Sequence, residues 1–307
     1  MKKNFLKIGD YSPEQLQEML DLAVELKTER KEKGANTPIL KDKMLAMIFQ
    51  KPSLRTRVSF DMAMRQLGGD AIYLSPAEIG LGKRESIADV ARVLSGYVDA
   101  IMARVFEHEH VEQLAEWASV PVVNGLSDFN HPCQAMADAL TIQEEFGTLK
   151  DINVTYVGDG NNVAVSLMQI CTKLGANFTI GNPKDYDMPA DAIQISREFT
   201  KQSGSKMTFT NDAIEAVTGA DVIYTDTWTS MGQEEETKKR QAVFPPFQIN
   251  KELLKHAKPT AIVMHCLPAH RNEELTYEVA DGPQSRIFQE AHNRMHAQKA
   301  ILAKMLS

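Results

Sequence analysis

Residues 44–69 read MLAMIFQKPSLRTRVSFDMAMRQLGG. The apolar run at 44–50 predicts a buried strand, because a strand covered on both faces shows no alternation of polar and apolar residues. A helix is predicted to follow from about Thr56 to Leu67 and to end at the Gly68-Gly69 pair. A buried strand that leads directly into a helix is the building unit of a parallel α/β sheet.

The same unit recurs along the rest of the chain. Further strands are predicted at 71–75, 100–105, 121–126, 153–157, 178–181, 207–210, 221–225 and 261–265. The longer helices are predicted at about 13–34, 85–97, 109–118, 131–146 and 289–306. We therefore expect an α/β protein with two domains, each a mostly parallel sheet with helices on both faces, plus a C-terminal helix. The predicted limits are 1–147, 148–288 and 289–307, and packing of the last segment back on the first domain is left open.

Composition narrows the class of protein. The 307 residues carry a formal net charge of -7, which argues against nucleic acid as the main partner because phosphate backbones reward a basic excess. The three cysteines form an odd set, which is typical of a reducing cytoplasm rather than of a disulfide framework. No apolar run is long enough to predict a membrane span. We expect a cytoplasmic protein whose ligands are small molecules.

The loop between the first strand and its helix has the chemistry of an anion site. Amides at a helix N-terminus point at an anion, and Ser53 and Thr56 add hydroxyl groups. Arg55 and Arg57 add guanidinium donors that suit phosphate or carboxylate. The alternative is a solvated basic helix start with an ordinary serine cap.

Two further strand ends carry polar groups in an apolar context. Arg104 closes the run at 100–104, where a guanidinium needs an anionic partner, either a ligand or a structural partner such as Glu107. His131 and Gln134 lie three apart at the start of a helix and so share a face. That face suits a planar carbonyl with an attached amide nitrogen, although a simple helix cap explains the residues equally well.

The second half offers three more polar strand ends. Gly158-Asp159-Gly160 opens a helix, but Val163 replaces the third glycine of a dinucleotide fingerprint, so no nicotinamide cofactor is expected. Asp226 begins a loop, residues 226–232, that can fix a substrate ammonium. The charged run at 233–240 is interpreted as a solvated helix with i,i+4 pairs. Cys266 is either a nucleophile or, as we favour, a small group that lines the site.

We expect no bound metal. His292 and His296 lie four apart on a helix, but the glutamate of a His-Glu-x-x-His zinc site is missing between them. In open parallel sheets, ligands bind beyond the carboxyl ends of the strands, where all of these polar groups fall. We therefore expect them to serve one shared site.

Taken in order, these motifs resemble those of the aspartate/ornithine carbamoyltransferase family. The resemblance rests on residues 53–57, Arg104, residues 131–134 and residues 265–268. The loop at 226–232 and the pair Asn161-Asn162 are similar to the ornithine branch. The resemblance covers nearly the whole chain. It implies transfer of a carbamoyl group from carbamoyl phosphate to the side-chain amine of L-ornithine, giving L-citrulline and phosphate without a cofactor.

The resemblance also implies roles for individual residues. The phosphate would be held by Ser53, Leu54 through its amide, Arg55, Thr56 and Arg104. The carbonyl oxygen would be contacted by Thr56, Arg104 and His131, and the carbamoyl nitrogen by Gln134, Arg294 and the main chain near Cys266 and Leu267. Ornithine would be bound by Asn162, Asp226, Ser230 and Met231. Arg104, His131, Cys266 and Arg294 would form the catalytic set.

Some points stay open at this stage. Gly80 stands where relatives present a side chain to a neighbouring subunit, and Lys83 or Arg84 is a possible substitute. The resemblance implies a homotrimer or a multiple of it. It does not decide whether the protein acts in arginine synthesis or in arginine breakdown. Rival interpretations are a carbamoyltransferase for aspartate or putrescine, and a small-anion binding protein without chemistry. Residues 230–232 offer no basic group for a second carboxylate, which speaks against aspartate.

Overall fold

The computed structural model describes residues 3–82, 84–229 and 234–306. The chain forms two compact units, which we call unit 1 (Met1–Leu140 with His292–Ser307) and unit 2 (Thr141–Ala291). The chain passes from one unit to the other within helix α6 (Pro132–Phe146) and again within helix α13 (Ile287–Leu306). No helix in the described part of the chain combines the length and apolar character needed to cross a lipid bilayer.

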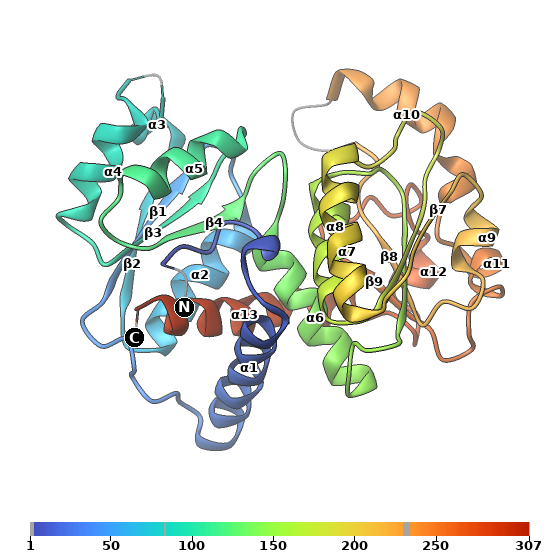
Figure 1. Ribbon diagram of the computed structural model, residues 1–307, viewed down its shortest axis with the longest axis horizontal. Coiled ribbons are helices and arrows are strands. Elements are labelled where there is room, and N and C mark those ends of the chain that lie inside the picture. Colours follow the sequence, from blue (N-terminus) through green and yellow to red (C-terminus); the bar gives the residue numbers. More distant parts are fainter. Residues whose placement is uncertain (1–2, 83, 230–233, 307) are drawn as a thin grey trace. The chain divides into compact units, whose positions relative to one another are not determined.

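Unit 1 is built on a four-stranded sheet in the order β2-β1-β3-β4, with every pairing parallel (Figure 1). Its strands are β1 (Met44–Phe49), β2 (Asp70–Leu74), β3 (Ala100–Arg104) and β4 (Val122–Leu126). Its other helical segments are η1 (Ile8–Asp10), α1 (Pro13–Lys33), α2 (Leu54–Gln66), α3 (Pro76–Ile79), α4 (Ile87–Ser95) and α5 (His108–Trp117). Strands β1 and β3 are almost entirely buried, as their continuous apolar runs predict.

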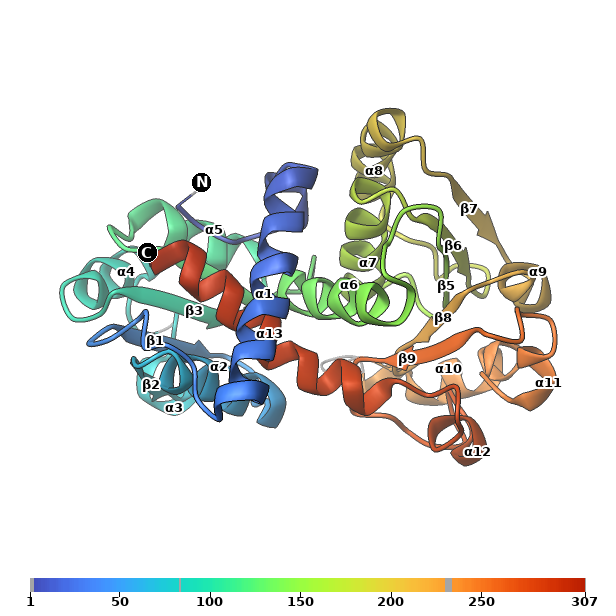
Figure 2. The same ribbon diagram turned by 90° about the horizontal axis from the view of Figure 1, so that it is seen from below.

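Helix α1 shows how local sequence sets an element. Ser12 accepts a hydrogen bond from the Gln15 amide, and the Gln15 side chain accepts one from the Ser12 amide, which makes a capping box. Gly34 ends the helix in the left-handed region at φ 73°. The part of α13 that belongs to unit 1 lies beside α1 (Figure 2), where Lys27 donates to Asn293 at 2.7 Å.

Unit 2 contains a five-stranded parallel sheet in the order β7-β6-β5-β8-β9. Its strands are β5 (Asn153–Val157), β6 (Asn177–Gly181), β7 (Met207–Thr210), β8 (Val222–Thr225) and β9 (Ile262–His265). Its helical segments are α7 (Asn162–Lys173), α8 (Ala190–Ser203), α9 (Ala213–Val217), η2 (Glu234–Glu236), α10 (Thr237–Val243), η3 (Pro245–Phe247), α11 (Lys251–Leu254) and α12 (Tyr277–Ala280). The core between β8, β9 and the short helices is apolar, with Ile223, Val263 and Leu275 fully buried.

Strand order determines where each unit can bind a ligand. In unit 1 the order reverses between β1 and β3, and in unit 2 it reverses between β5 and β8. At such a switch point the loops that follow the two strands diverge and leave a crevice at their carboxyl ends. The loops concerned are residues 50–53 and 105–107 in unit 1, and residues 158–161 and 226–229 in unit 2. These are the polar segments that the sequence singled out.

The predicted fold class is confirmed, and every predicted strand is present with ends within one residue of the prediction. Helices α3, α9, α11 and α12 were not predicted, because a helix of four or five residues is too short to show a 3.6-residue period. The 14-residue helix α8 was also not predicted. The proposed domain limits at 147 and 288 lie close to the two crossings, and residues 292–307 belong to unit 1.

Candidate active site

The anion loop of unit 1 begins helix α2 with Ser53 as its N-cap. The Ser53 hydroxyl accepts from the Thr56 amide at 3.3 Å and donates to the Thr56 hydroxyl at 3.1 Å. Thr56 is buried, whereas the side chain at Leu54 is 76% exposed. Only the main chain of Leu54 is therefore suited to a role in the loop, as the sequence analysis expected.

Arg294 connects three helices within unit 1. Its guanidinium donates to the Gln134 carboxamide oxygen at 2.6 Å and to the Thr56 hydroxyl at 3.2 Å. Gln134 in turn donates to the Asp138 carboxylate at 2.8 Å. All of these side chains are buried. The structure thus places Thr56, Gln134 and Arg294, which come from α2, α6 and α13, in direct contact.

His131 lies at the centre of a group of cations. Its pKa is well below its ordinary value, first because the ring is buried and then because Arg294, Arg104, Arg55 and Lys51 all repel a proton on it. The imidazole is therefore neutral at neutral pH and can donate one N–H to a carbonyl oxygen. An array of four cations around a neutral ring is suited to a ligand that carries several negative charges.

Arg104 reaches this group from the end of strand β3. It stands opposite Phe49 in the parallel register, and its carbonyl accepts from the Gln50 amide at 2.8 Å. The β1 and β3 ends are therefore held together where their loops begin. The neighbouring Arg57 packs its guanidinium over the Tyr73 ring at 4.1 Å, which fits a supporting role for the loop.

Lys51 is the residue of this cluster that the sequence analysis missed. It is only 8% exposed, and its ammonium lies 4.5 Å from the centre of the Phe106 ring. Burial lowers the pKa of Lys51, the Arg104 charge lowers it further, and Asp128 opposes both. Its position directly after a buried strand and next to the anion loop was the available signal. A lysine beside a loop is usually solvated, and only the packing shows that this one is not.

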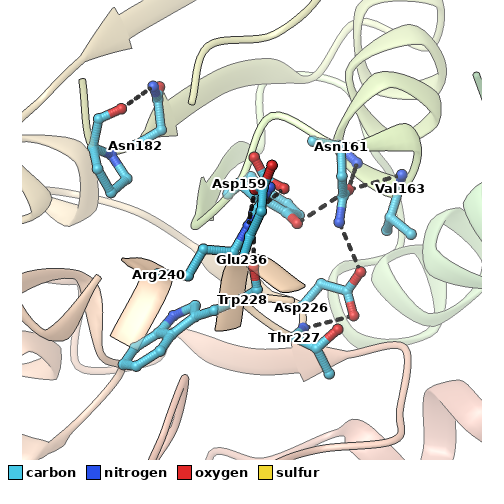
Figure 3. Close-up of polar contacts among 12 residues, drawn as sticks. Asp159, Asn161, Val163, Asn182, Asp226, Thr227, Trp228, Glu236 and Arg240 are labelled. Atoms are coloured by element: carbon cyan, nitrogen blue, oxygen red, sulfur yellow. Dashed lines mark hydrogen bonds and ion pairs between the residues drawn. The ribbon is translucent and has the colours of Figure 1, made fainter. Parts of the chain in front are cut away.

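In unit 2 the corresponding crevice is lined by Asp226 and Asn161 (Figure 3). Asn161 caps helix α7 by accepting from the amides of Val163 and Ala164 at 3.0 and 3.1 Å. Its amide group donates to one oxygen of Asp226 at 2.9 Å. The other Asp226 oxygen accepts from the Thr227 amide at 2.8 Å. The carboxylate is therefore oriented on both sides. Asn161 makes this direct contact with Asp226, and the predicted role of the adjacent Asn162 in binding ornithine stays a prediction.

Cys266 contacts the same carboxylate. Its thiol donates to Asp226 at 3.1 Å. This contact agrees with a lining role for Cys266 and gives no support to a nucleophile. Leu267, the next residue, has a left-handed backbone at φ 58° before a cis bond to Pro268.

His265 is a fixed structural group. Its Nδ1 accepts from the Leu267 amide at 2.9 Å, and its Nε2 lies 2.9 Å from the Glu274 carboxylate. Asp226, His265 and Cys266 offer three potential metal ligands within 4.8 Å of one another. Because both ring nitrogens of His265 are already engaged, the imidazole is a poor ligand here.

Both halves of the chain match models of one protein family. Residues 3–144 match the "Aspartate/ornithine carbamoyltransferase, carbamoyl-P binding domain", and residues 150–305 match the "Asp/Orn binding domain" of the same family. The chain belongs to the aspartate/ornithine carbamoyltransferase family. The carbamoyl-P model covers His131 with Lys51, Arg55 and Arg104, whereas the Asp/Orn model covers Asp226 and also Arg294, the fourth cation of the cluster.

Close relatives of this family member are ornithine carbamoyltransferases. That of Pyrococcus abyssi is 54% identical over 99% of this chain and 96% of its own length. The "Ornithine carbamoyltransferase, anabolic" of Pyrococcus furiosus is 52% identical over the same shares. A solved structure of the Pyrococcus furiosus ornithine carbamoyltransferase superposes with a TM-score of 0.96 over 99% of this chain and 96% of that one, at 52% identity.

One sequence-based interpretation of this carbamoyltransferase was wrong. Arg240 does not lie on a solvated helix face, because it is only 4% exposed. It donates to Asp159 at 2.6 Å and to the Trp228 carbonyl at 2.8 Å, while its pair with Glu236 at 3.0 Å matches the predicted i,i+4 spacing (Figure 3). Burial raises the pKa of Asp159, and the Arg240 hydrogen bond and charge oppose that rise. Charge periodicity indicates a helix but cannot show which cation turns inward.

The remaining predicted residues lie partly outside the described chain. Ser230 and Met231 fall in the gap at 230–233, and Lys83 is likewise outside the described residues. Gly80 ends α3 in the left-handed region at φ 51°. Arg84 donates to the Glu78 carbonyl within its own loop at 3.4 Å, so its role towards a neighbouring subunit stays a prediction.

Proposed function

We propose that this chain is an enzyme that transfers the carbamoyl group of carbamoyl phosphate to the side-chain amine of L-ornithine, producing L-citrulline and phosphate. The observation that carries this proposal is the cluster of four cations around the neutral His131 in unit 1. A phosphate dianion attached to a carbonyl has the charge and the acceptors that such a cluster requires. The names of the close relatives support ornithine as the acceptor.

The donor phosphate is assigned to the start of helix α2 and the cations beside it. Ser53, the Leu54 amide, Arg55, Thr56 and Arg104 supply its hydrogen bonds in this proposal, and Lys51 adds a charge that the sequence analysis did not include. Helix N-terminal amides and charged hydrogen bonds stabilise a bound phosphate and, more strongly, the phosphate that leaves.

The carbonyl group is assigned to the contacts around Arg294. When an amine adds to the carbonyl carbon, the oxygen becomes an oxyanion, which Thr56, Arg104 and the neutral His131 stabilise. In this proposal the Gln134 oxygen, which Arg294 orients, accepts from the carbamoyl nitrogen, as do the main-chain carbonyls at Cys266 and Leu267. The carbon–oxygen bond to phosphate then breaks, and the phosphate takes the electron pair.

Ornithine is assigned to the Asp226 crevice of unit 2. Asp226 offers a carboxylate oriented by Asn161 and the Thr227 amide, which suits the α-ammonium of an amino acid. Asn162, Ser230 and Met231 complete this proposed group. The α-carboxylate and α-ammonium are thus held apart from the side-chain amine that reacts.

The difficult step is to present a neutral amine. A lysine-like ammonium has a pKa of about 10.4, so only about one molecule in a thousand is neutral at pH 7, which costs about 4 kcal/mol. Fixing both reactants side by side offsets more than this, since orientation is worth about 7–11 kcal/mol. The amine loses one proton on the way to citrulline, and the departing phosphate is a base of suitable strength to take it.

The same proposal covers the pathway, the cellular location and the oligomeric state of the enzyme. The word "anabolic" in the name of the Pyrococcus furiosus relative supports a role in arginine biosynthesis. The odd cysteine count supports a cytoplasmic location, and the family resemblance supports a homotrimer or a multiple of it. We assign residues 1–147 to carbamoyl phosphate and residues 148–288 to ornithine, with no cofactor.

A citrulline assay with four acceptors tests the proposal. The purified chain is incubated with carbamoyl phosphate and either L-ornithine, putrescine, L-aspartate or N-acetylornithine. We expect turnover with ornithine to exceed that with each alternative by at least a hundredfold. Preference for another acceptor would reassign the enzyme within its family. Binding of carbamoyl phosphate without phosphate release on addition of any amine would favour a binding protein.

A further inference from the structure

Glu290, which no motif singled out, is a buried carboxylate beneath the Asp226 crevice. It lies near the start of helix α13 within unit 2 and has no exposed surface. One oxygen accepts from the Tyr224 hydroxyl at 2.9 Å, and the other accepts from the His265 amide at 2.8 Å. Glu290 therefore joins the end of β8 to the end of β9, the strands that precede Asp226 and Cys266.

The contacts continue from Tyr224 to the Asp226 carboxylate. The Tyr224 ring stacks on Tyr156, with centroids 5.8 Å apart and planes inclined by 18°. The Tyr156 hydroxyl donates to Asn161 at 3.3 Å, and Asn161 donates to Asp226 at 2.9 Å. Burial and the Asp226 charge keep the pKa of Tyr156 well above its ordinary value, so the hydroxyl remains a donor.

The path closes on the other side through Cys266. Its thiol donates to Asp226 at 3.1 Å, and the amide of the preceding residue, His265, donates to Glu290. The His265 ring is fixed independently by Glu274 and the Leu267 amide. The contacts thus form a closed ring in which Glu290 accepts hydrogen bonds from both strands, from Tyr224 on β8 and from His265 on β9.

We infer that Glu290 is a positioning residue for ornithine, because it fixes the Tyr224 side and the His265 side of the Asp226 carboxylate at once. This inference rests on the proposed function. A buried carboxylate is costly unless its oxygens are hydrogen-bonded, so an apolar residue would stabilise the core equally well if packing were the only demand. A carboxylate or carboxamide is required where two donors must be held at a set separation.

The inference distinguishes hydrogen bonding from charge. Glutamine has the shape of glutamate, and its oxygen can accept from the His265 amide while its NH₂ group donates to the Tyr224 oxygen. Leucine keeps the approximate volume and loses both contacts. E290Q should therefore preserve the closed ring of contacts around Asp226. E290L should remove the contacts to both Tyr224 and His265.

The test compares E290Q, E290L, Y224F and the surface control Q289A in the full-length enzyme. For each variant we would measure the ornithine KM, kcat, the Kd of carboxylate-bearing norvaline in the presence of carbamoyl phosphate, the Kd of carbamoyl phosphate alone, and Tm. We expect E290L to raise the ornithine KM and the norvaline Kd at least tenfold. Y224F, which removes one of the two bonds, should raise them about threefold. E290Q and Q289A should both stay within about 1.5-fold of the wild type, clearly below Y224F.

Carbamoyl phosphate affinity separates positioning from general damage. Its cation cluster lies in unit 1, so its Kd should change less than threefold in every variant. A lower Tm with unchanged ornithine KM and norvaline Kd in E290L would overturn the inference, as would an E290Q variant as impaired as E290L. If E290L does not fold, Y224F against E290Q decides the question. A wild-type enzyme that makes no citrulline would instead refute the proposed function.

Discussion

The two crevices of this chain occupy equivalent places in their sheets but have opposite chemistry. In unit 1, Lys51, Arg55, Arg104 and Arg294 surround one neutral imidazole. In unit 2, Asp226 is held by an asparagine amide, a main-chain amide and a thiol. The charges of the unit 1 crevice suit an anion, and the carboxylate of the unit 2 crevice suits an ammonium group. A net charge of -7 over the whole chain conceals this division.

The comparison shows that the strand order determines where in each sheet a ligand can bind. The side chains at that place determine which kind of ligand it suits. Both crevices lie where the strand order reverses, between β1 and β3 or between β5 and β8. In unit 1 the ligand is expected to neutralise charges that the fold brings together at a cost. In unit 2 the Asp226 carboxylate already accepts hydrogen bonds from Asn161, the Thr227 amide and Cys266 without a ligand. Loss of a cation should therefore impair function more than loss of the carboxylate charge.

The largest effect is expected at Arg104. Arg104→Met keeps an apolar stem but removes the guanidinium from the end of β3. Two charged hydrogen bonds to the donor are worth about 3 kcal/mol or more, so kcat/KM for carbamoyl phosphate should fall at least a hundredfold. Arg55→Ala should cost at least tenfold. Steady-state kinetics measure both, with the exposed Arg65→Ala as the control, and near-normal kinetics in both would remove this cluster from the site.

A smaller and more selective effect is expected at Asp226. Asp226→Asn retains an acceptor for the Thr227 amide but loses the charge that would pair with the substrate ammonium. The ornithine KM should rise about thirtyfold, which corresponds to about 2 kcal/mol, while the Kd of carbamoyl phosphate alone stays within twofold. Calorimetry and kinetics on the same preparation give both values. An equal loss of affinity for the two substrates would mean that carbamoyl phosphate and ornithine do not bind in separate crevices.

The pH dependence of stability should reveal the environment of His131, which is buried among cations, without any substrate. The pKa of His131 is lowered in the folded protein, so the unfolded chain binds a proton near pH 6.5 before the folded chain does. The stabilisation is fully present above about pH 6.5 and is lost as the pH falls below it, by up to about 1.4 kcal/mol per pH unit. Urea unfolding of wild type and His131→Gln at pH 7.5, 6.5 and 5.5 measures this slope. Parallel slopes in the two proteins would contradict the prediction.

The smallest effect is expected at Cys266. Cys266→Ser preserves a donor to Asp226, so the variant should fold and keep activity within about tenfold, with an altered ornithine KM. The thiol of Cys133, whose pKa is raised to about 12 by burial, serves as an unreactive internal comparison. Mass spectrometry during turnover should find no carbamoyl group on either cysteine. A trapped carbamoyl-Cys266 would establish covalent catalysis and overturn the lining role.

The fold class and the approximate place of the site follow from the amino-acid sequence. All nine strand positions could be predicted within one residue. Buried strands such as β1 and β3 appear as continuous apolar runs, whereas the edge strands β2 and β7 are only partly buried. Because polar groups stand out at the ends of such runs, Arg104, His131, Asp226 and Cys266 could be singled out. Motif order then indicated the family, which the two domain matches confirm.

Which polar side chains turn inward depends on tertiary packing and cannot be read from the amino-acid sequence. Lys51, Arg240 and Glu290 look like solvated charges in the sequence, and each is buried by contacts with residues far away in the chain. Arg294 is separated from Thr56 by more than two hundred positions, yet the guanidinium meets that hydroxyl at 3.2 Å. The strand order brings such residues together. The periodicity of a sequence indicates only which face of its own helix or strand a residue occupies. Charge partners that are distant in sequence leave no local signal.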